Sequence, residues 1–331
     1  MMGFVVRFFG LGMVVFLLLF LLNNVLTFWF GWPGSIAYLS GSGADAGRHP
    51  LGLLQVGSYV AGLAAVGVWV FKSAAGGMRT DARRLDRLAG YIVRGAFWSV
   101  LLIGLVDGVI SFLRVEDLLP GLVGEQFGKS LGRPSYRGEY LHFPLILVAY
   151  GVAAVYRKLD FAWLAILVVF AEFLIVISRF VFSYEQAFMA DLVRFWYAAL
   201  FLFASAYALI HEGHVRVDVL YARFGCRVRA WVNAVGALVL GLPVCWTILW
   251  YGTDGKGASI NSPLLSYEIS QSGYGMYVKY LMAAFLLIFA VSMVVQFCAY
   301  ILHAAADLAD EPGAVFEPDA SAPADVDALE A

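Results

Sequence analysis

The chain has 331 residues, of which 62% are hydrophobic and 14% are charged, and its formal net charge is −2. A soluble chain of this composition would carry too little polar surface to stay dissolved, which excludes the two soluble domains that the length alone would allow. Apolar runs of about 20 residues recur, the length that a helix needs to cross a bilayer. We therefore predict an all-α integral membrane protein, since a β-barrel would show alternating segments of about ten residues.

Eight apolar runs are predicted to span the membrane. They cover residues 4–30, 51–71, 90–113, 140–156, 160–182, 191–210, 231–251 and 274–303. The fourth run is the shortest, and His142 and Pro144 interrupt its start. The first run is interpreted as a retained span rather than a signal peptide, because the cleavage-like triplet Ala44-Asp45-Ala46 lies well beyond its end.

The distribution of Lys and Arg predicts the orientation of these spans. If the N-terminus is cytoplasmic, twelve Lys and Arg residues fall at the inner loops and six at the outer loops. Because inner loops carry the excess of positive charge in membrane proteins, we expect both termini to be cytoplasmic.

Two polar residues fall near one end of the third and fourth spans. At about 1.5 Å of rise per residue, Asp107 lies roughly 9 Å and His142 roughly 4 Å inside the same membrane surface. Charge inside a span is costly and usually paired or functional. The two side chains are therefore a candidate pair; the alternative is an interfacial His142 and an Asp107 that is solvated or buried in protein.

The fifth and sixth spans carry three further charged residues. Arg179 closes the fifth span and Asp191 opens the sixth, and a short loop makes the two helices antiparallel neighbours. The pair is expected either to clamp this hairpin as an ion pair or to contact a partner subunit. Glu172 lies one heptad before Arg179 on the same face, and it is either a polar contact to a partner helix or a protonated acid.

A charged strip from Ala208 to Trp231 separates the sixth and seventh spans and holds two His and four Arg. Its apolar residues recur at helical spacing, which favours an amphipathic helix lying along the membrane interface. His211, His214 and Asp218 would share one helix face, and such residues can bind a metal. No third imidazole or thiolate lies in a suitable frame, so we predict no metal site.

In the same strip, His214 and Asp218 are expected to hydrogen-bond along the helix. Arg216 and the other arginines of the strip would face lipid headgroups or an acidic partner.

The end of the chain is acidic. Eight acids and no base lie between Asp307 and Glu330, among Pro and Ala, so residues 305–331 are predicted to be a disordered cytoplasmic tail. The three cysteines are scattered, which indicates neither a disulfide framework nor a zinc site.

From about residue 159 onward the sequence resembles the small permease subunit of tripartite ATP-independent periplasmic (TRAP) transporters, the DctQ-like proteins. The likeness rests on "SRFVFS" at the end of the fifth span, on Asp191, and on the run His214 to Asp218 within "HEGHVRVDV". It also rests on "NSPLLSYEI" in the last hairpin. "HEGHVRVDV" is closer to the mannitol/chloroaromatic branch than to the sialic acid branch.

The resemblance implies a function as well as a fold. Residues 159–304 would form a four-helix small-permease domain with the interfacial helix, and residues 1–158 an extension of about four helices that matches no known motif. The chain would scaffold a large permease subunit of the bacterial inner membrane, which binds sodium and substrate, and a periplasmic binding protein would deliver a solute such as an organic acid. Membrane lipids would be further partners; nucleic acid would not.

Other classes of function have less support in the sequence. A stand-alone carrier usually shows repeated halves with paired helix breaks, whereas Pro243 with Gly241 stands alone. A haem would need His at matched depths, and His142 and His303 lie at opposite ends of their spans. No nucleophile–base arrangement or phosphate-binding motif is visible. We therefore predict a protein that is not an enzyme and needs no cofactor.

Overall fold

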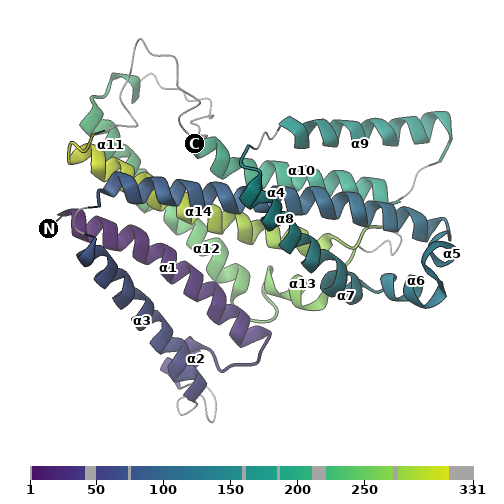
Figure 1. The fold of residues 1–331 in the computed structure, drawn as a ribbon, viewed down its shortest axis with the longest axis horizontal. Coiled ribbons are helices and arrows are strands. Elements are labelled where there is room, and N and C mark those ends of the chain that lie inside the picture. The colour runs from purple at the N-terminus through teal and green to yellow at the C-terminus, as the bar shows by residue number, and fades with distance from the viewer. Residues whose placement is uncertain are drawn as a thin grey trace. The chain divides into compact units, whose positions relative to one another are not determined.

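The computed structural model describes residues 2–41, 50–73, 76–158, 162–184, 187–210, 221–270 and 275–312. Within these ranges the regular structure is helical throughout, as Figure 1 shows. The elements are α1 (Met2–Phe28), α2 (Ser35–Ser40), α3 (Pro50–Lys72), α4 (Met78–Val115), α5 (Leu119–Val123), α6 (Glu125–Leu131), α7 (Pro134–Arg137), η2 (Gly138–His142), α8 (Phe143–Val155), α9 (Ala162–Val181), α10 (Ala187–Ile210), η3 (Tyr221–Arg223), α11 (Cys226–Gly236), η4 (Ala237–Gly241), α12 (Leu242–Thr253), α13 (Asn261–Ser266) and α14 (Lys279–Leu308).

Eight of the described helical segments are long and apolar enough to cross a membrane, which confirms the predicted all-α membrane fold. The short fourth run is part of one helical segment, Pro134–Val155, and the seventh is Cys226–Thr253. The third span is longer than predicted. It begins at Met78 rather than at residue 90, so the basic stretch from Arg79 to Arg87 is helical instead of forming a loop.

Two of the described spans contain a turn of π-helix that ends two residues before a proline. η2 precedes Pro144, and η4 precedes Pro243. Proline lacks an N–H and its ring clashes with the carbonyl of the preceding turn, and a π-turn is one way in which a helix absorbs such an interruption. Both prolines therefore leave their spans continuous.

The chain forms two compact units, and both combine helices from before and after residue 159. The first unit comprises Met1–Ala89, His214–Lys256 and Met293–Pro323. In it α1 packs along α3. The rings of Phe16 and Phe20 lie tilted and edge-on against that of Trp246 in α12, with centroids 5.4 and 5.6 Å apart. Gly10 faces Leu302 of α14 where the two helices come close.

The second unit comprises Gly90–Gly213, Gly257–Ser292 and Ala324–Ala331. Here α9 packs on α10, and Phe195 and Phe203 of α10 contact Phe285 of α14. Gly104 of α4 leaves room for the indole of Trp196, whose Nε1 donates to the carbonyl of Val100.

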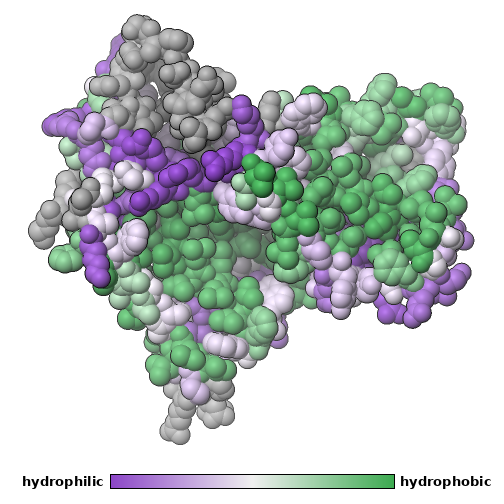
Figure 2. Space-filling view, viewed as in Figure 1, coloured by the Kyte–Doolittle hydropathy of each residue, from purple (hydrophilic) through white to green (hydrophobic). Residues whose placement is uncertain are grey.

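Figure 2 shows hydrophilic residues gathered over the first half of α4 and hydrophobic residues covering α9. The two helices differ as expected from their sequences, because α4 begins with a run of Arg and Asp whereas α9 is almost wholly apolar.

Candidate functional site

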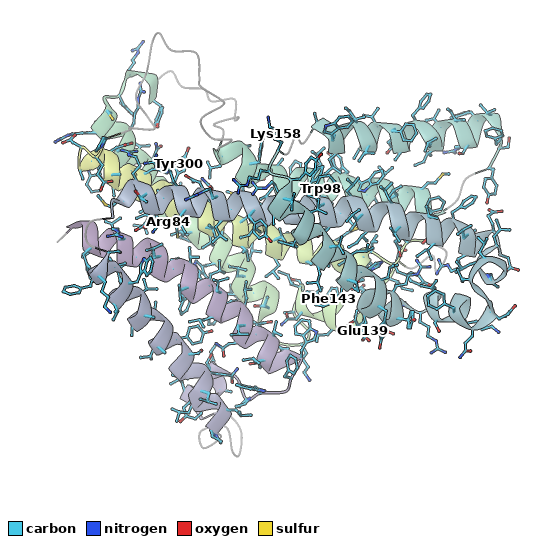
Figure 3. All side chains as sticks on the ribbon, viewed as in Figure 1. Arg84, Trp98, Glu139, Phe143, Lys158 and Tyr300 are labelled. Carbon is cyan, nitrogen blue, oxygen red and sulfur yellow. The ribbon has the colours of Figure 1, made fainter. Side chains whose placement is uncertain are left out.

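The most deeply buried polar side chains of the second unit meet around Asp107. Asp107 and Ser111 are one turn apart on α4, Arg137 ends α7, and His142 ends η2. Tyr277 and Tyr280 come from the start of α14 or just before it. We call these six residues the Asp107 cluster. In Figure 3 the labelled Glu139 and Phe143 mark the segment from α7 to α8, to which Arg137 and His142 also belong.

Both oxygens of the Asp107 carboxylate have partners. Oδ1 accepts a hydrogen bond from Nη1 of Arg137 at 2.7 Å and lies 3.1 Å from Nε2 of His142. Oδ2 accepts the backbone N–H of Tyr277 at 3.0 Å. The side chains of Asp107, Arg137 and His142 are all 0% exposed. A buried carboxylate needs this many donors, because an unpaired charge away from water is strongly disfavoured.

Arg137 is held on several sides. Its Nε donates to the carbonyl of Leu131 at 2.6 Å, and Nη1 also donates to the hydroxyl of Ser111 at 3.1 Å. The guanidinium lies 4.4 Å from the ring centroid of Tyr277, a cation–π contact that Arg114 also makes at 4.4 Å. Nη2 is buried and has no hydrogen-bond partner among the described residues, which leaves the Tyr277 ring as its neighbour.

His142 links this cluster to the last span, because its Nδ1 lies 2.7 Å from the hydroxyl of Tyr280. Tyr280 stacks edge-on against Tyr267, which precedes α14 and donates to Glu139 at 3.4 Å. Burial raises the pKa of the Tyr267 hydroxyl, and the negative charge of Glu139 adds to that effect. The chain of contacts therefore runs from α4 through η2 to α14.

The candidate pair of Asp107 and His142 is confirmed by this geometry. Arg137, which is the stronger partner, was predicted only as an outer-loop cation. A signal for it was present: a carboxylate about two turns inside a span needs a cation, and Arg137 precedes His142 by little more than one helical turn.

A second set of buried charges lies in the first unit, along α4 and α14. Asp86 accepts from Nε2 of His303 at 2.8 Å and from Nε2 of Gln296 at 2.9 Å. Seven residues earlier on α4, Nη2 of Arg79 donates to Asp307 at 2.5 Å. We call Arg79, Asp86, Gln296, His303 and Asp307 the α4–α14 seam. Spacings of seven residues on α4, and of seven and four residues on α14, keep these side chains on one face of each helix.

Buried polar atoms without a hydrogen-bond partner in the described part of the chain gather in this seam. They are Nε and Nη1 of Arg79, Oε1 of Gln296, Nδ1 of His303 and Oδ2 of Asp307. Buried polar atoms are normally paired with protein or ordered water. The seam therefore holds five buried polar atoms that are unpaired among the described residues.

The two ends of the seam carry further contacts. The Glu311 carboxylate accepts the backbone N–H groups of Met78 and Arg79, each at 3.1 Å, at the first turn of α4. Nε of Arg7 in α1 donates to Asp81 at 2.7 Å, and Nη2 donates to the hydroxyl of Ser73 at 2.9 Å. Asp307 had been expected in the disordered tail, but α14 extends to Leu308 and Arg79 holds its end.

The expected ion pair between Arg179 and Asp191 is replaced by other contacts. Oδ2 of Asp191 accepts from the Ser270 hydroxyl and from the Met276 N–H, both at 3.1 Å. Its ion pair within the described ranges is with Arg194, one turn along the same helix, at 3.7 Å. Arg179 is exposed on α9. The contacts of the Asp191 carboxylate are thus with Ser270, Met276 and Arg194.

Glu172 is also exposed, near the middle of α9. Of the eight spans, α9 has the smallest share of buried residues, 11%. Its exposed large side chains are Trp163, Ile166, Val169, Phe170, Phe173, Leu174, Val176, Phe180 and Val181. Glu172 thus lies on a helix that the rest of the described chain leaves largely uncovered.

The remaining predicted site residues, His214, Arg216 and Asp218, and the weighed ligand His211, lie outside the described residues. In the ranges that the structure describes, no group of three His, Cys, Asp or Glu side chains is arranged to hold a metal ion. The three cysteines are free thiols.

Comparison with known proteins finds a similarity for the C-terminal part of the chain. Residues 161–309 match the family model described as "Tripartite ATP-independent periplasmic transporters, DctQ component". The match covers α9 to α14, and four of the eight apolar spans precede it. No curated protein and no solved structure gives a significant match. Residues 161–309 are therefore similar to the DctQ component of the tripartite ATP-independent periplasmic transporters, and four apolar spans lie ahead of this matched region.

Proposed function

We propose that the chain is the small membrane subunit of a TRAP transporter in a bacterial inner membrane, with both termini in the cytoplasm. It would scaffold the large permease subunit during sodium-coupled, binding-protein-dependent uptake of an organic acid, in a system of the mannitol/chloroaromatic branch. Sodium and substrate would bind to the large subunit, and this chain would have no catalytic activity of its own.

The position of Glu172 is the observation that carries this proposal. The 20 residues of α9 extend over about 30 Å, close to the thickness of the hydrocarbon core. Glu172 lies about 15 Å from the start of the helix and is exposed. An ionised side chain at the centre of a span costs about 2.5–3.5 kcal/mol when lipid surrounds it. A partner helix with a donor or a cation would remove that cost.

The residues around Glu172 on α9 are also consistent with a partner helix. Val169 and Val176 lie within one turn of Glu172 on its side of the helix, and both are exposed. Charged groups inside membranes usually face a protein neighbour. We therefore assign the Glu172 face of α9 to the large subunit, with Arg179 at the end of the same face, where its long side chain can reach the interface.

The interior of the chain supports a rigid scaffold. The Asp107 cluster joins α4 to the start of α14, and the α4–α14 seam joins the same two helices in the first unit. The Asp107 cluster connects the N-terminal helices to the matched region by hydrogen bonds to Tyr277 and Tyr280, and the seam connects them by the buried ion pair of Arg79 with Asp307. We infer that the extension enlarges the stationary part of the transporter rather than forming a separate module.

The charged strip would add a second assembly surface at the inner membrane face. Its described part includes Arg227, which pairs with Asp310 at 3.0 Å with both side chains exposed, and Arg229, which lies 5.5 Å from the Tyr221 ring. His214, Arg216 and Asp218 would continue this surface. Cations near an anionic membrane surface contribute about 1 kcal/mol each.

Co-purification in mild detergent tests the assignment. The tagged chain is expressed with the large subunit, and wild type is compared with Glu172→Leu and with Val68→Leu, a change at an exposed residue of α3. We expect Glu172→Leu to reduce recovery of the large subunit and Val68→Leu to leave it unchanged. If Glu172 faces lipid, the Leu variant would instead insert more readily and recover as much partner as wild type. Solute uptake by the purified chain alone in liposomes would contradict the scaffold role altogether.

A further inference from the structure

We propose that a cavity among the N-terminal helices binds one membrane phospholipid whose headgroup carries an ammonium, such as an ethanolamine phospholipid. The cavity has a volume of about 710 Å³ and lies between α1, α2, α3 and the end of α12. All of its lining residues belong to the first compact unit. Its volume is within the range of about 300–1,000 Å³ that is typical of ligand sites.

The walls of the cavity are apolar and aromatic. They are formed by Phe16, Phe20, Phe28, Ile36, Leu39, Val56, Val60 and Trp250. Ile36, Leu39 and Val60 are also among the most exposed apolar residues of the chain, so apolar side chains border the opening. We expect this opening to face the hydrocarbon of the membrane, where an acyl chain is the apolar occupant that the bilayer supplies.

The cavity is shaped by fixed contacts around it. The backbone N–H of Gly34 donates to Oε1 of the buried Gln55 at 2.9 Å, and Nε2 of Gln55 donates to the Thr27 hydroxyl at 3.0 Å. These bonds fold the chain after α1 back onto α3, so that α2 forms one wall. Gly34 has φ +89°, a conformation that favours glycine. On the other side the ring of Phe20 stacks 6.2 Å from that of Trp250.

Polar residues from α1, α2, α3 and the end of α12 also line the cavity. The polar lining residues are Asn23, Asn24, Thr27, Ser35, Ser40, Tyr59, Thr253 and Asp254. Nδ2 of Asn24 donates to the carbonyl of Thr253 at 3.1 Å, which places the following residue, Asp254, at the rim. Amides and hydroxyls can donate to the phosphate oxygens of a lipid.

The charge of this rim selects the headgroup. Among the residues that the structure describes, the lining includes one carboxylate, Asp254, and no Lys, Arg or His. An opposite charge nearby stabilises an ammonium, whereas a like charge disfavours an anionic lipid that has no cation to compensate it. The site is therefore matched to a headgroup with both a phosphate and an ammonium, and poorly matched to phosphatidylglycerol.

Lipid binding by the full-length chain in mild detergent tests the proposal. Delipidated protein is offered ethanolamine and glycerol phospholipids with identical acyl chains, and bound lipid is counted by native mass spectrometry. We expect one ethanolamine lipid per chain and a preference of about tenfold, equivalent to about 1.4 kcal/mol. Asp254→Asn should remove that preference, while Glu125→Gln, at an exposed acid distant from the cavity in sequence, should keep it.

A second pair of variants tests the cavity itself. Val60→Trp would fill it, whereas Val68→Trp adds the same bulk to the same helix at a residue that does not line it; the two valines are 66% and 55% exposed. We expect Val60→Trp to lower lipid occupancy about tenfold and Val68→Trp to leave it unchanged.

Equal occupancy in the two tryptophan variants, or a wild-type preference for phosphatidylglycerol, would overturn the proposal. If Val60→Trp fails to fold, as gel filtration would show, the headgroup preference of wild type and Asp254→Asn still decides. Because no large subunit is present, this outcome is independent of the proposed transporter assembly.

Discussion

Nη1 of Arg137 lies 2.7 Å from Oδ1 of Asp107, and neither side chain reaches the surface. The pair joins α7 to α4, and the Tyr277 backbone completes it by donating to the second carboxylate oxygen. Three segments that are remote in the sequence thus depend on one carboxylate, and the consequences of removing it can be stated in energetic terms.

Breaking this ion pair should be costly, whereas replacing both partners should cost less. Asp107→Asn or Arg137→Met leaves one buried charge without its counter-ion, which typically costs about 3–5 kcal/mol. The double variant Asp107→Leu with Arg137→Met removes both charges and should recover part of that loss. Thermal unfolding in detergent measures the difference.

The exposed pair of Lys129 and Glu125 is the matched control for this experiment, because it has the same type of interaction at the surface. Lys129→Met should change the unfolding temperature little, since exposed i,i+4 pairs contribute about 0.3–0.5 kcal/mol. A double variant at 107 and 137 that is no better than the singles would show that the pair is not the coupled unit described above.

Sequence reasoning succeeded where the physical signal was local. The length of an apolar run is a direct measure of membrane thickness, so the eight spans were predictable from composition alone. Counting the rise per residue also placed Asp107 and His142 at compatible depths, and they meet at 3.1 Å. Each of these steps used only residues within one segment or its neighbour.

Sequence reasoning missed the contacts that join residues remote from each other in the sequence. The first turns of α4 carry too many charges to read as part of a span, yet Arg79 and Asp81 are buried against Asp307 and Arg7. Arg137 reads as a loop cation until a helix begins at Pro134 and carries it inward. Asp191 accepts from the backbone N–H of Met276, and a partner 85 residues away in sequence has no local signal.

Glu311 should stabilise the start of α4 although it follows the last helix. Its carboxylate accepts the N–H groups of Met78 and Arg79, which otherwise lack partners at a helix N-terminus. Replacing such a capping group by Ala typically costs about 1 kcal/mol, and a negative charge also interacts favourably with the helix dipole. We expect Glu311→Ala to lower stability by about that amount and to speed amide hydrogen exchange in the first turn of α4.

Asp310→Ala is the control for Glu311, since Asp310 is the neighbouring acid and its pair with Arg227 is exposed on both sides. This variant should leave hydrogen exchange in α4 unchanged. If both variants have the same effect, general loss of negative charge rather than capping is responsible.

Two glycines of α4, one turn apart, should respond oppositely to the same substitution. A Cβ at Gly104 would overlap the indole of Trp196, whereas a Cβ at Gly108 meets nothing within 4 Å. Overpacking at a close helix contact costs about 1–3 kcal/mol, while Gly→Ala in a helix that has room gains up to about 1 kcal/mol. Gly104→Ala should therefore lower the unfolding temperature and Gly108→Ala should keep or raise it; a loss of equal size at both positions would contradict close packing of α4 on α10.

Asp191 is expected to act as a hydrogen-bond acceptor rather than as a member of an ion pair. Its hydrogen-bond donors are the Ser270 hydroxyl and the Met276 N–H. The side chain of Arg194 is exposed, and its Nη1 lies 3.7 Å from Oδ1 of Asp191. Asp191→Leu removes both acceptor bonds and leaves buried donors unpaired, which costs about 1–3 kcal/mol each, so it should destabilise the chain markedly. Arg194→Met should change stability by less than about 0.5 kcal/mol, because exposed i,i+3 pairs contribute little. A double-mutant cycle of Asp191 with Arg179 should give no coupling energy, and a coupling above about 1 kcal/mol would restore the hairpin clamp that the residue spacing first suggested.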